Sequence, residues 1–317
     1  MADMHSLFLK FNDNITLSSS KADFLKTSRD AIRRDIKKWF SDNDKKQPKF
    51  CWQGSFSMKT TVNPLNDEYD MDDGVYLQGY EEDGLDDYPA VYTAHSWVKS
   101  AVDNRTSYHT MDKNTCVRVK YANNYHIDLP IYIVKEDKAY LAHKSKGWTI
   151  SDPKAFTDWF IDKVKMNSEQ LRRIVKYLKA WKDYNNVPLK GIEITILVVD
   201  SFSDYDGRDE ISLRNTVQGI STVLHTSFSC TKPVEPYEDL FESKTDNQKK
   251  EIKESLKRLI YSLDSAIQSD DGYDGSVILR EEFGSRFPLG KRSNPNDEYR
   301  YERASAPGIL KHDGRSA

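Results

Sequence analysis

The stretch 53-QGSFSMK-59, followed by 67-DEYDMDDG-74, joins a small-residue turn to a run of acidic side chains. In a β-strand, residues two positions apart share a face. When residues 69–77 are placed in a strand, Asp70 and Asp72 project together, away from a mostly apolar face. The stretch therefore predicts a strand that presents two carboxylates close to a turn.

A third carboxylate interrupts a later apolar segment. The same period-two pattern in residues 126–133 leaves Asp128 on the side opposite a row of isoleucine and leucine. Asp73 differs from these three acids, because it falls on the apolar face of its strand. A carboxylate in such a setting is costly unless it is paired, hydrogen-bonded or bound to a cation.

Three converging carboxylates would repel one another and raise a pKa, and divalent cations relieve that repulsion. Magnesium prefers oxygen ligands and keeps room for substrate phosphates. We therefore predict that Asp70, Asp72 and Asp128 form a two-metal phosphoryl-transfer site. Gly54 allows the backbone to approach a ligand closely, and Ser55 adds a hydroxyl and an amide for a phosphate.

Each half of this pattern also has a simpler interpretation. A Gly-Ser pair is common in loops, and Asp-x-Asp occurs in solvated turns and in calcium loops. An EF-hand loop that starts at Glu68 requires glycine at position 73 and glutamate at position 79. The chain has Asp73 and Gly79 there, so the calcium-loop interpretation fails.

Composition limits the class of protein. The chain has 317 residues, 38% of them hydrophobic and 31% charged, which suits two lobes that share a cleft. Its formal charge of −3 argues against a protein that mainly grips nucleic acid. The N-terminal residues lack a signal-peptide pattern, and no apolar run approaches the length of a membrane span, so a cytoplasmic protein without membrane contact is expected. Cys51, Cys116 and Cys230 have no zinc-binding spacing and are predicted to be reduced core thiols.

Periodicity predicts a different secondary structure for each half of the chain. The first half is expected to contain a long helix at 21–44, a helix at 89–104 and strands at 49–52, 74–78, 117–121, 125–134 and 138–142, the last three as an antiparallel meander. The second half is expected to contain only helices, at 152–165, 168–184, 190–202, 209–227, 244–268 and 274–283. The predicted fold is α+β, with a catalytic lobe at 1–147, a helical lobe at 148–290 and a mobile tail at 291–317.

Three segments of the first half, 53-QGSFSMKT-60, 68-EYDMDDGVYL-77 and 125-YHIDLPIY-132, resemble the bacterial cyclic GMP-AMP synthase-like enzymes. These CD-NTases act in anti-phage signalling and belong to the DNA polymerase β-like nucleotidyltransferase superfamily. Two later segments, 171-LRRIVKYLKAWKDY-184 and 283-FGSRFPLG-290, are similar to the helical lobe of that family. The resemblance implies a bilobal fold with a mixed or antiparallel sheet and an active site between the lobes.

The resemblance also implies residue roles. Asp70 and Asp72 would bind two magnesium ions, with manganese as a substitute, and Asp128 would hold the ion that activates the acceptor hydroxyl. Gln53, Gly54 and Ser55 would contact the donor phosphates, and Lys179 would reach them from the helical lobe. Periodicity alone places Lys176 and Lys179 near the flank of their helix, where a lysine is most often solvated.

The implied reaction is attack by a ribose hydroxyl of one nucleotide on the α-phosphate of another. Repetition and ring closure would give a cyclic di- or trinucleotide from nucleoside triphosphates, ATP among them. One alternative is a nucleotidyltransferase that modifies a protein, an RNA end or a small molecule. Another is a non-catalytic nucleotide- or RNA-binding protein, which would suit a broken carboxylate set and a more basic chain.

Partners and departures complete the comparison with the family. Family members are commonly encoded with HORMA-type or ubiquitin-transfer-like regulators, and a tail that ends at residues 313–317 with DGRSA is compatible with either. The zinc insertion of the animal DNA sensor has no counterpart here, so direct activation by DNA through it is not supported. Residues 188–191, PLKG, replace the small or hydroxyl residue that is common there, and no second phosphate contact is assigned to them.

Overall fold

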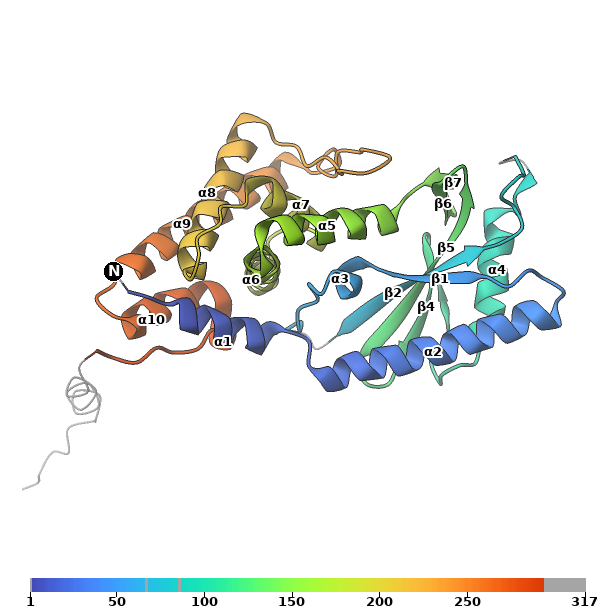
Figure 1. Cartoon of the computed structure of the whole chain (residues 1–317), viewed down its shortest axis with the longest axis horizontal. Helices are drawn as coiled ribbons and strands as arrows, with labels where there is room; N and C mark the ends of the chain where they lie inside the picture. Colours follow the sequence, from blue (N-terminus) through green and yellow to red (C-terminus); the bar gives the residue numbers. More distant parts are fainter. Residues whose placement is uncertain (1, 66–67, 85–86, 294–317) are drawn as a thin grey trace, which may run out of the picture.

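Two halves of unlike secondary structure make up this chain, and a computed structural model describes residues 2–65, 68–84 and 87–293 of it. A twisted sheet flanked by helices forms one end of the molecule in Figure 1, and a bundle of helices forms the other. The predicted α+β architecture, with a mixed sheet and a helical second half, is confirmed.

The described residues contain a sheet of seven strands: β1 (Lys49–Gln53), β2 (Tyr69–Leu77), β3 (Met111–Asp112), β4 (Cys116–Tyr121), β5 (Tyr125–Lys135), β6 (Lys138–His143) and β7 (Gly147–Ile150). Their order is β1-β2-β5-β4-β3, and β6 pairs with both β5 and β7. The predicted meander is confirmed, because β4, β5 and β6 pair antiparallel. Strands β2 and β5 pair in parallel, an arrangement that brings the two aspartate-bearing strands together.

Helices α2 (Ser19–Asp42) and α4 (Val91–Val102) cover one face of this sheet. Their apolar residues pack with the odd-numbered apolar side chains of β2 and β5. The long helix predicted at 21–44 is confirmed. Ser20 and Asp23 resemble a capping box in the sequence, but both lie within the helix. Ser18 caps the helix instead, since its side chain accepts a hydrogen bond from the backbone amide of Lys21 at 3.3 Å.

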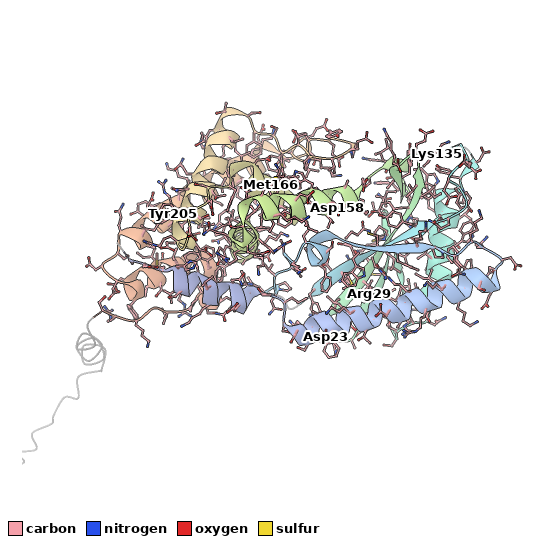
Figure 2. The ribbon with its side chains drawn as sticks, viewed as in Figure 1. Asp23, Arg29, Lys135, Asp158, Met166 and Tyr205 are labelled. Carbon is pink, nitrogen blue, oxygen red and sulfur yellow. The ribbon has the colours of Figure 1, made fainter. Side chains whose placement is uncertain are left out.

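The second half is mainly helical, as predicted, but the expectation of helices alone from residue 148 is wrong, because strand β7 extends to Ile150. Its helices are α5 (Pro153–Asn167), α6 (Glu169–Asn185), α7 (Gly191–Ser201), α8 (Asp209–Thr226), α9 (Asp246–Gln268) and α10 (Gly272–Phe283), and a short 3₁₀ turn, η2 (Gly284–Arg286), follows. Helix α5 reaches back over the sheet, so Asp158 of α5 and Arg29 of α2 lie on opposite sides of β1 (Figure 2). None of the described helices combines the length and the apolar character that crossing a membrane requires.

Helix α1 (His5–Ile15) was not expected from the sequence, and it packs on the helical half. Phe8 and Phe11 lie with their ring centroids 5.2 and 5.5 Å from that of Tyr177 on α6. The predicted catalytic lobe, residues 1–147, included this helix. Its buried residues belong instead to the hydrophobic cluster of the helical half. The division of the remaining chain near residue 147 stays a prediction.

The first residues of the predicted C-terminal tail are described by the structure. Ser293 donates its backbone amide to Asp271 at 3.0 Å, so residues 291–293 contact the start of α10. Residues 294–317 of the predicted tail lie outside the described residues.

All three cysteines are free thiols. Cys116 and Cys230 are buried as predicted, whereas Cys51 is partly exposed.

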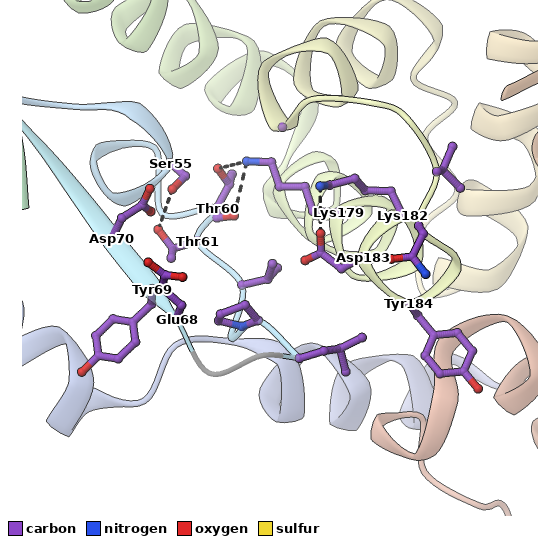
Figure 3. Close-up of a pocket in the computed structure, with 16 residues that line it drawn as sticks. Ser55, Thr60, Thr61, Glu68, Tyr69, Asp70, Lys179, Lys182, Asp183 and Tyr184 are labelled. Atoms are coloured by element: carbon purple, nitrogen blue, oxygen red, sulfur yellow. Dashed lines mark hydrogen bonds and ion pairs between the residues drawn. The ribbon is translucent and has the colours of Figure 1, made fainter. Parts of the chain in front are cut away.

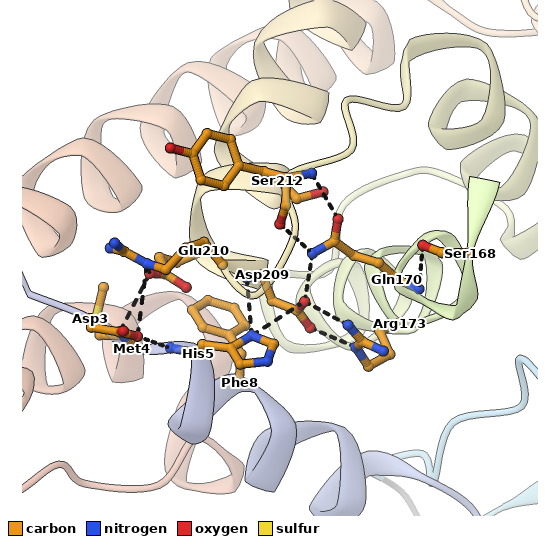
Figure 4. A network of polar contacts seen from close by, with 12 residues as sticks. Asp3, Met4, His5, Phe8, Ser168, Gln170, Arg173, Asp209, Glu210 and Ser212 are labelled. Carbon is orange, nitrogen blue, oxygen red and sulfur yellow. Dashed lines mark hydrogen bonds and ion pairs between the residues drawn. The ribbon is translucent and has the colours of Figure 1, made fainter.

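A buried ionic cluster joins α1, α6 and α8 (Figure 4). Asp209 is fully buried and accepts two hydrogen bonds from the Arg173 guanidinium, at 2.7 and 2.8 Å. Tyr177 and Gln170 each donate a further hydrogen bond to this carboxylate at 2.8 Å. Burial alone would raise the pKa of Asp209, but the hydrogen bonds from Arg173 and Gln170 more than offset it and leave the pKa lowered. The helical half therefore contains a buried carboxylate whose partners favour its ionised form.

Candidate active site

Strand β2 presents two carboxylates on one face, as its sequence predicts. Asp70 and Asp72 are partly exposed, while Tyr69, Met71 and Asp73 between and beside them are buried. Asp73 points to the other face, where Arg33 of α2 donates to its two carboxylate oxygens at 2.5 and 2.7 Å. Asp73 therefore pairs across the α2 interface and faces away from the other two carboxylates.

Strand pairing brings Asp128 next to Asp72. In the parallel register of β2 and β5, Asp72 lies opposite Asp128 and Asp70 lies opposite His126. Neighbouring strands are separated by about 4.8 Å, so side chains on the same face of these positions are close neighbours. The three predicted aspartates thus share one face of the sheet, although Asp128 is more than fifty residues from the other two along the chain.

Arg118 is an additional member of this group that the sequence analysis missed. It lies opposite Asp128 on β4 and donates two hydrogen bonds to the Asp128 carboxylate, at 2.6 and 2.7 Å. Such a fork-to-fork pair fixes the orientation of a carboxylate as well as neutralising it. In the antiparallel meander, counting residues outward from the 122–124 turn would have placed Arg118 beside Asp128.

The electrostatics of the cluster favour a bound cation. Burial raises the pKa of Asp72 to about 8, and the charges of Asp70 and Asp128 contribute to that increase. Burial also raises the pKa of Asp70, an effect that His126 opposes and Asp128 reinforces. Carboxylates that hinder one another's ionisation are hard oxygen donors suited to Mg²⁺ or Mn²⁺. The donor chemistry of Asp70, Asp72 and Asp128 therefore fits the expected cofactor.

The arrangement of these carboxylates does not yet form a closed coordination shell. Within residues 2–65, 68–84 and 87–293, no group of three or more His, Cys, Asp or Glu side chains is gathered closely enough to hold a metal ion. Asp128 is directed to Arg118 instead. Asp70 and Asp72 both line a cavity that is described below.

The predicted phosphate turn is the start of a short helix, α3 (Gly54–Ser57), which follows β1 directly. Gly54 has φ of +69°, a left-handed conformation that favours glycine. A Cβ at this position would also collide with the Asp72 carboxylate. The glycine therefore allows the turn to lie directly against one of the predicted metal ligands.

The two neighbours of Gly54 are placed differently. Ser55 lies at the rim of two cavities, and its hydroxyl is 3.0 Å from the hydroxyl of Thr61. Gln53 is buried, and its side-chain oxygen accepts a hydrogen bond from Tyr132 at 3.3 Å. Gln53 lines neither of these cavities, so its contact with phosphate stays a prediction.

Lys179 reaches the site from α6, on the helical side. Its ammonium donates to the hydroxyl of Thr60 at 3.0 Å and to the backbone carbonyl of the same residue at 3.4 Å. Burial lowers the pKa of Lys179 to about 8, and the charge of Asp70 opposes this change. Neither Lys176 nor Lys179 is solvated, as a lysine on the flank of a helix usually is, because both side chains are buried.

Two adjoining cavities lie between the halves. Figure 3 shows the residues that line the larger one. The larger has a volume of about 960 Å³ and the smaller about 420 Å³. Both are lined by Ser55 and Asp70 from the sheet half and by Lys179 and Gly191 from the helical half. Gly54 and Asp72 line the smaller cavity. A serine hydroxyl, two carboxylates and a lysine thus converge on one cleft from elements far apart in the sequence.

His126, two residues before Asp128 on β5, borders the carboxylates. Its Nε2 lies 3.7 Å from an oxygen of Asp70, and its Nδ1 lies 3.3 Å from an oxygen of Glu68. Burial lowers the pKa of His126, and the positive charge of Arg118 adds to this effect. The cleft thus has Lys179 on one side and the carboxylates with His126 on the other. It can accommodate a polyanion and its counter-cations between them.

The residues around this site are similar to those of known proteins. Residues 48–132 match the family model described as the cyclic GMP-AMP synthase DncV-like nucleotidyltransferase domain. A cyclic GMP-AMP synthase of Escherichia albertii is 31% identical over 191 residues, which cover 56% of this chain and 42% of that protein. One from Escherichia coli (strain TW11681) is 26% identical over 301 residues, covering 76% of this chain and 68% of the relative. The first match thus spans less than half of the relative, and the second spans about two thirds.

Solved structures extend the similarity to nearly the whole fold. The Vibrio cholerae DncV cyclic AMP-GMP synthase in complex with nonhydrolysable GTP aligns with a TM-score of 0.76 at 19% identity, covering 92% of this chain and 100% of the other. Escherichia coli DncV in its 3'-deoxy GTP-bound form aligns with a TM-score of 0.72 at 23% identity, covering 86% of this chain and 93% of that one. Residues 48–132 therefore match a DncV-like nucleotidyltransferase domain, and most of the chain is similar in sequence to cyclic GMP-AMP synthases and in fold to DncV.

Proposed function

We propose that this chain is a nucleotidyltransferase that joins nucleoside triphosphates into a cyclic di- or trinucleotide. The observation that carries the proposal is the cleft of about 960 Å³ in which Ser55 and Asp70 face Lys179 across the two halves. Related proteins support it, since one Vibrio cholerae DncV structure is described as a complex with the linear intermediate 5' pppA(3',5')pG. Nucleoside triphosphates, with ATP among them, are the proposed substrates.

The cleft residues divide into phosphate-binding and carboxylate groups. Lys179, the Ser55 hydroxyl and the backbone at Gly54 would bind the donor triphosphate, and Gln53 would support this turn from behind. Asp70 and Asp72 would hold two Mg²⁺ ions, or Mn²⁺ in their place, and Asp128 would complete the ligands of one ion. The bound ions would neutralise the phosphate charge and favour the ionised form of the acceptor hydroxyl.

The reaction then needs little covalent participation by the protein. A ribose oxygen of the acceptor forms a bond to the donor α-phosphorus, and the bond from that phosphorus to the β-phosphate bridging oxygen breaks. The hydroxyl proton leaves to solvent, and pyrophosphate departs with the electron pair of the broken bond. Ser55 and Lys179 would position the triphosphate, and the cations that Asp70 and Asp72 would hold would neutralise its charge. These two effects would supply the catalytic advantage.

Product analysis tests this function. The purified protein is incubated with Mg²⁺ and with ATP, GTP, CTP and UTP, each labelled at the α-phosphate in turn. We expect a small labelled product that resists phosphatase, and its mass and its digestion by linkage-specific nucleases identify the bases and the ring size. Label in a protein, an RNA end or another small molecule would instead support the alternative nucleotidyltransferase activity, and no transfer of label would contradict both.

The turn at Gly54 provides a separate prediction. We expect Gly54→Ala to lower the rate at least about tenfold, which corresponds to about 1.4 kcal/mol, because the added methyl group meets the Asp72 carboxylate. Gly147→Ala is a matched control, since Gly147 has φ of +79° but nothing within 4 Å of the added Cβ. Both variants incur backbone strain, so a rate equally lowered in both would show that the contact with Asp72 is unimportant.

The biological setting is part of the same proposal. The family resemblance supports a cytoplasmic enzyme of anti-phage signalling. A HORMA-type or ubiquitin-transfer-like partner would act through the C-terminal tail, most of which lies outside the described residues. Phage resistance of cells that express the wild-type chain, and its loss with Asp72→Asn, is the corresponding cellular result.

A further inference from the structure

The segment Met58–Asn63 connects the phosphate turn to the strand of carboxylates and touches both predicted phosphate-binding side chains. Thr61 lies 3.0 Å from the Ser55 hydroxyl, and Thr60 accepts a hydrogen bond from Lys179. Thr60 is fully buried. A displacement of this segment would therefore move contacts of Ser55 and of Lys179 together.

Three cations of the helical half bind backbone carbonyls of this segment. Arg172 donates to Met58 at 3.0 Å, Lys179 donates to Thr60 at 3.4 Å, and Arg286 donates to Asn63 at 2.8 Å. Charge-assisted hydrogen bonds of this kind are stronger than those between neutral groups. The segment belongs to the sheet half, so these contacts fix one half of the cleft to the other.

Arg286 differs from the other two cations because its guanidinium spans two elements. While one nitrogen binds the carbonyl of Asn63, the other donates to the carbonyl of Ala180 at 3.1 Å. Ala180 directly follows Lys179 on α6. The planar fork of an arginine holds two acceptors in a fixed relation, which the flexible ammonium of a lysine does less well.

Asn63 also forms hydrogen bonds with the end of α1 and with the start of α2. Its backbone amide donates to Ile15 at 2.6 Å, and its side-chain oxygen accepts from Lys21 at 2.7 Å. Asn63 is therefore a fixed point at which the end of α1, the start of α2 and Arg286 meet. Movement of Arg286 would be transmitted through Asn63 to Thr61 and Thr60, which are two and three residues away along the chain.

The motif 283-FGSRFPLG-290 explains how Arg286 reaches this point. Phe283 and Phe287 are buried against Phe8 and Phe11 of α1, with ring centroids 5.0 to 6.2 Å apart. Gly284 has φ of +71°, and a Cβ there would collide with the ring of Tyr184, which lines the larger cavity. The two phenylalanines anchor the turn, and the glycine lets it lie close enough for Arg286 to enter between the halves.

We infer that Arg286 is a positioning residue, which sets the distance between the Ser55 turn and Lys179 by bridging Asn63 and Ala180. This inference rests on the proposed function, because its catalytic consequence requires that Ser55 and Lys179 bind the triphosphate. A misplacement of about 1 Å of groups that position a substrate is enough to lower a rate on the order of 100-fold. The inference gives the C-terminal motif a role in the cleft without any contact with substrate.

The test compares Arg286→Gln with Arg286→Lys and with Arg214→Gln. Arg214 forms a comparable bidentate ion pair with Asp264, and this pair joins α8 to α9 within the helical half. We expect Arg286→Gln to lower kcat about 10- to 100-fold per folded molecule. Arg286→Lys should recover part of this loss, and Arg214→Gln should stay within about twofold of wild type.

A second readout does not depend on nucleotide transfer. Hydrogen exchange is measured at the amides of Thr60 and Asn63, which are bonded to Ser55 and Ile15, and should accelerate in Arg286→Gln but not in Arg214→Gln. If the wild-type protein makes no nucleotide product, the proposed function fails, and exchange alone decides the coupling. Exchange as slow as in wild type, or a kcat within twofold of wild type, would overturn the inference. If Arg286→Gln does not fold, Arg286→Lys is used for both measurements.

Discussion

Replacement of Asp72 by asparagine is expected to lower product formation at least about 1,000-fold, a loss of about 4 kcal/mol of transition-state stabilisation. Asp72 lies against Gly54 on one side and opposite Asp128 on the other, at the centre of the carboxylate group. An amide has nearly the same shape as the carboxylate but lacks its charge, so it cannot neutralise a divalent cation. The change removes the proposed metal-binding chemistry while leaving the space filled.

Product formed from α-labelled nucleotides measures this effect, alongside thermal unfolding of the same preparation. Asp137→Asn is a matched control, because Asp137 is an exposed carboxylate in the turn between β5 and β6. Its positive φ of 60° is one that asparagine tolerates well. We expect the control to retain wild-type activity. Wild-type activity in Asp72→Asn as well would remove Asp72 from the active site.

The second large effect concerns stability. We expect Asp209→Asn to lower the free energy of unfolding by about 3–5 kcal/mol, because it leaves the Arg173 guanidinium half-buried without its charged partner. Asp264→Asn removes the carboxylate of the more exposed pair with Arg214 and should cost about 1 kcal/mol or less. Chemical denaturation of both variants provides the comparison. Equal losses would show that burial does not increase the contribution of the Asp209 ion pair to the free energy of unfolding.

The same cluster predicts a dependence of stability on acidity. The pKa of Asp209 is lowered in the folded protein, while the unfolded carboxyl titrates near its usual value of about 3.9. The cluster therefore contributes fully above that value, and its contribution is lost as the pH falls below it toward the lowered pKa. Asp209→Asn should flatten this part of the curve of unfolding free energy against pH. A variant curve parallel to that of wild type below pH 4 would contradict the assignment.

The local geometry of the carboxylates could be predicted from the sequence because a strand has a strict period of two. Asp70 and Asp72 share a face, Asp73 takes the other, and the apolar row around Asp128 marks a strand buried on both sides. Helical periods likewise gave the position of Lys179 on α6. These features depend on neighbours within one element, which the sequence records directly.

Features that depend on contacts between distant elements could not be obtained in this way. The parallel register that sets Asp72 beside Asp128 joins β2 to β5. Along the chain, a helix and two other strands lie between these two strands. The burial of Lys179 depends on Thr60, a residue 119 positions away along the chain. Helix α1 lacks a side-chain cap, so nothing at its start marks it in the sequence, and its phenylalanines become interpretable only against Tyr177 and Phe283.

The most direct test of the proposed reaction measures pyrophosphate release and phosphatase-resistant product together. The wild-type protein and the double variant Asp70→Asn/Asp72→Asn are incubated with the four nucleoside triphosphates and Mg²⁺. We predict one pyrophosphate for each phosphodiester bond formed by the wild-type protein, and neither product nor pyrophosphate from a double variant that unfolds at the wild-type temperature. Equal product from the two proteins would contradict the assignment of this cleft as the active site.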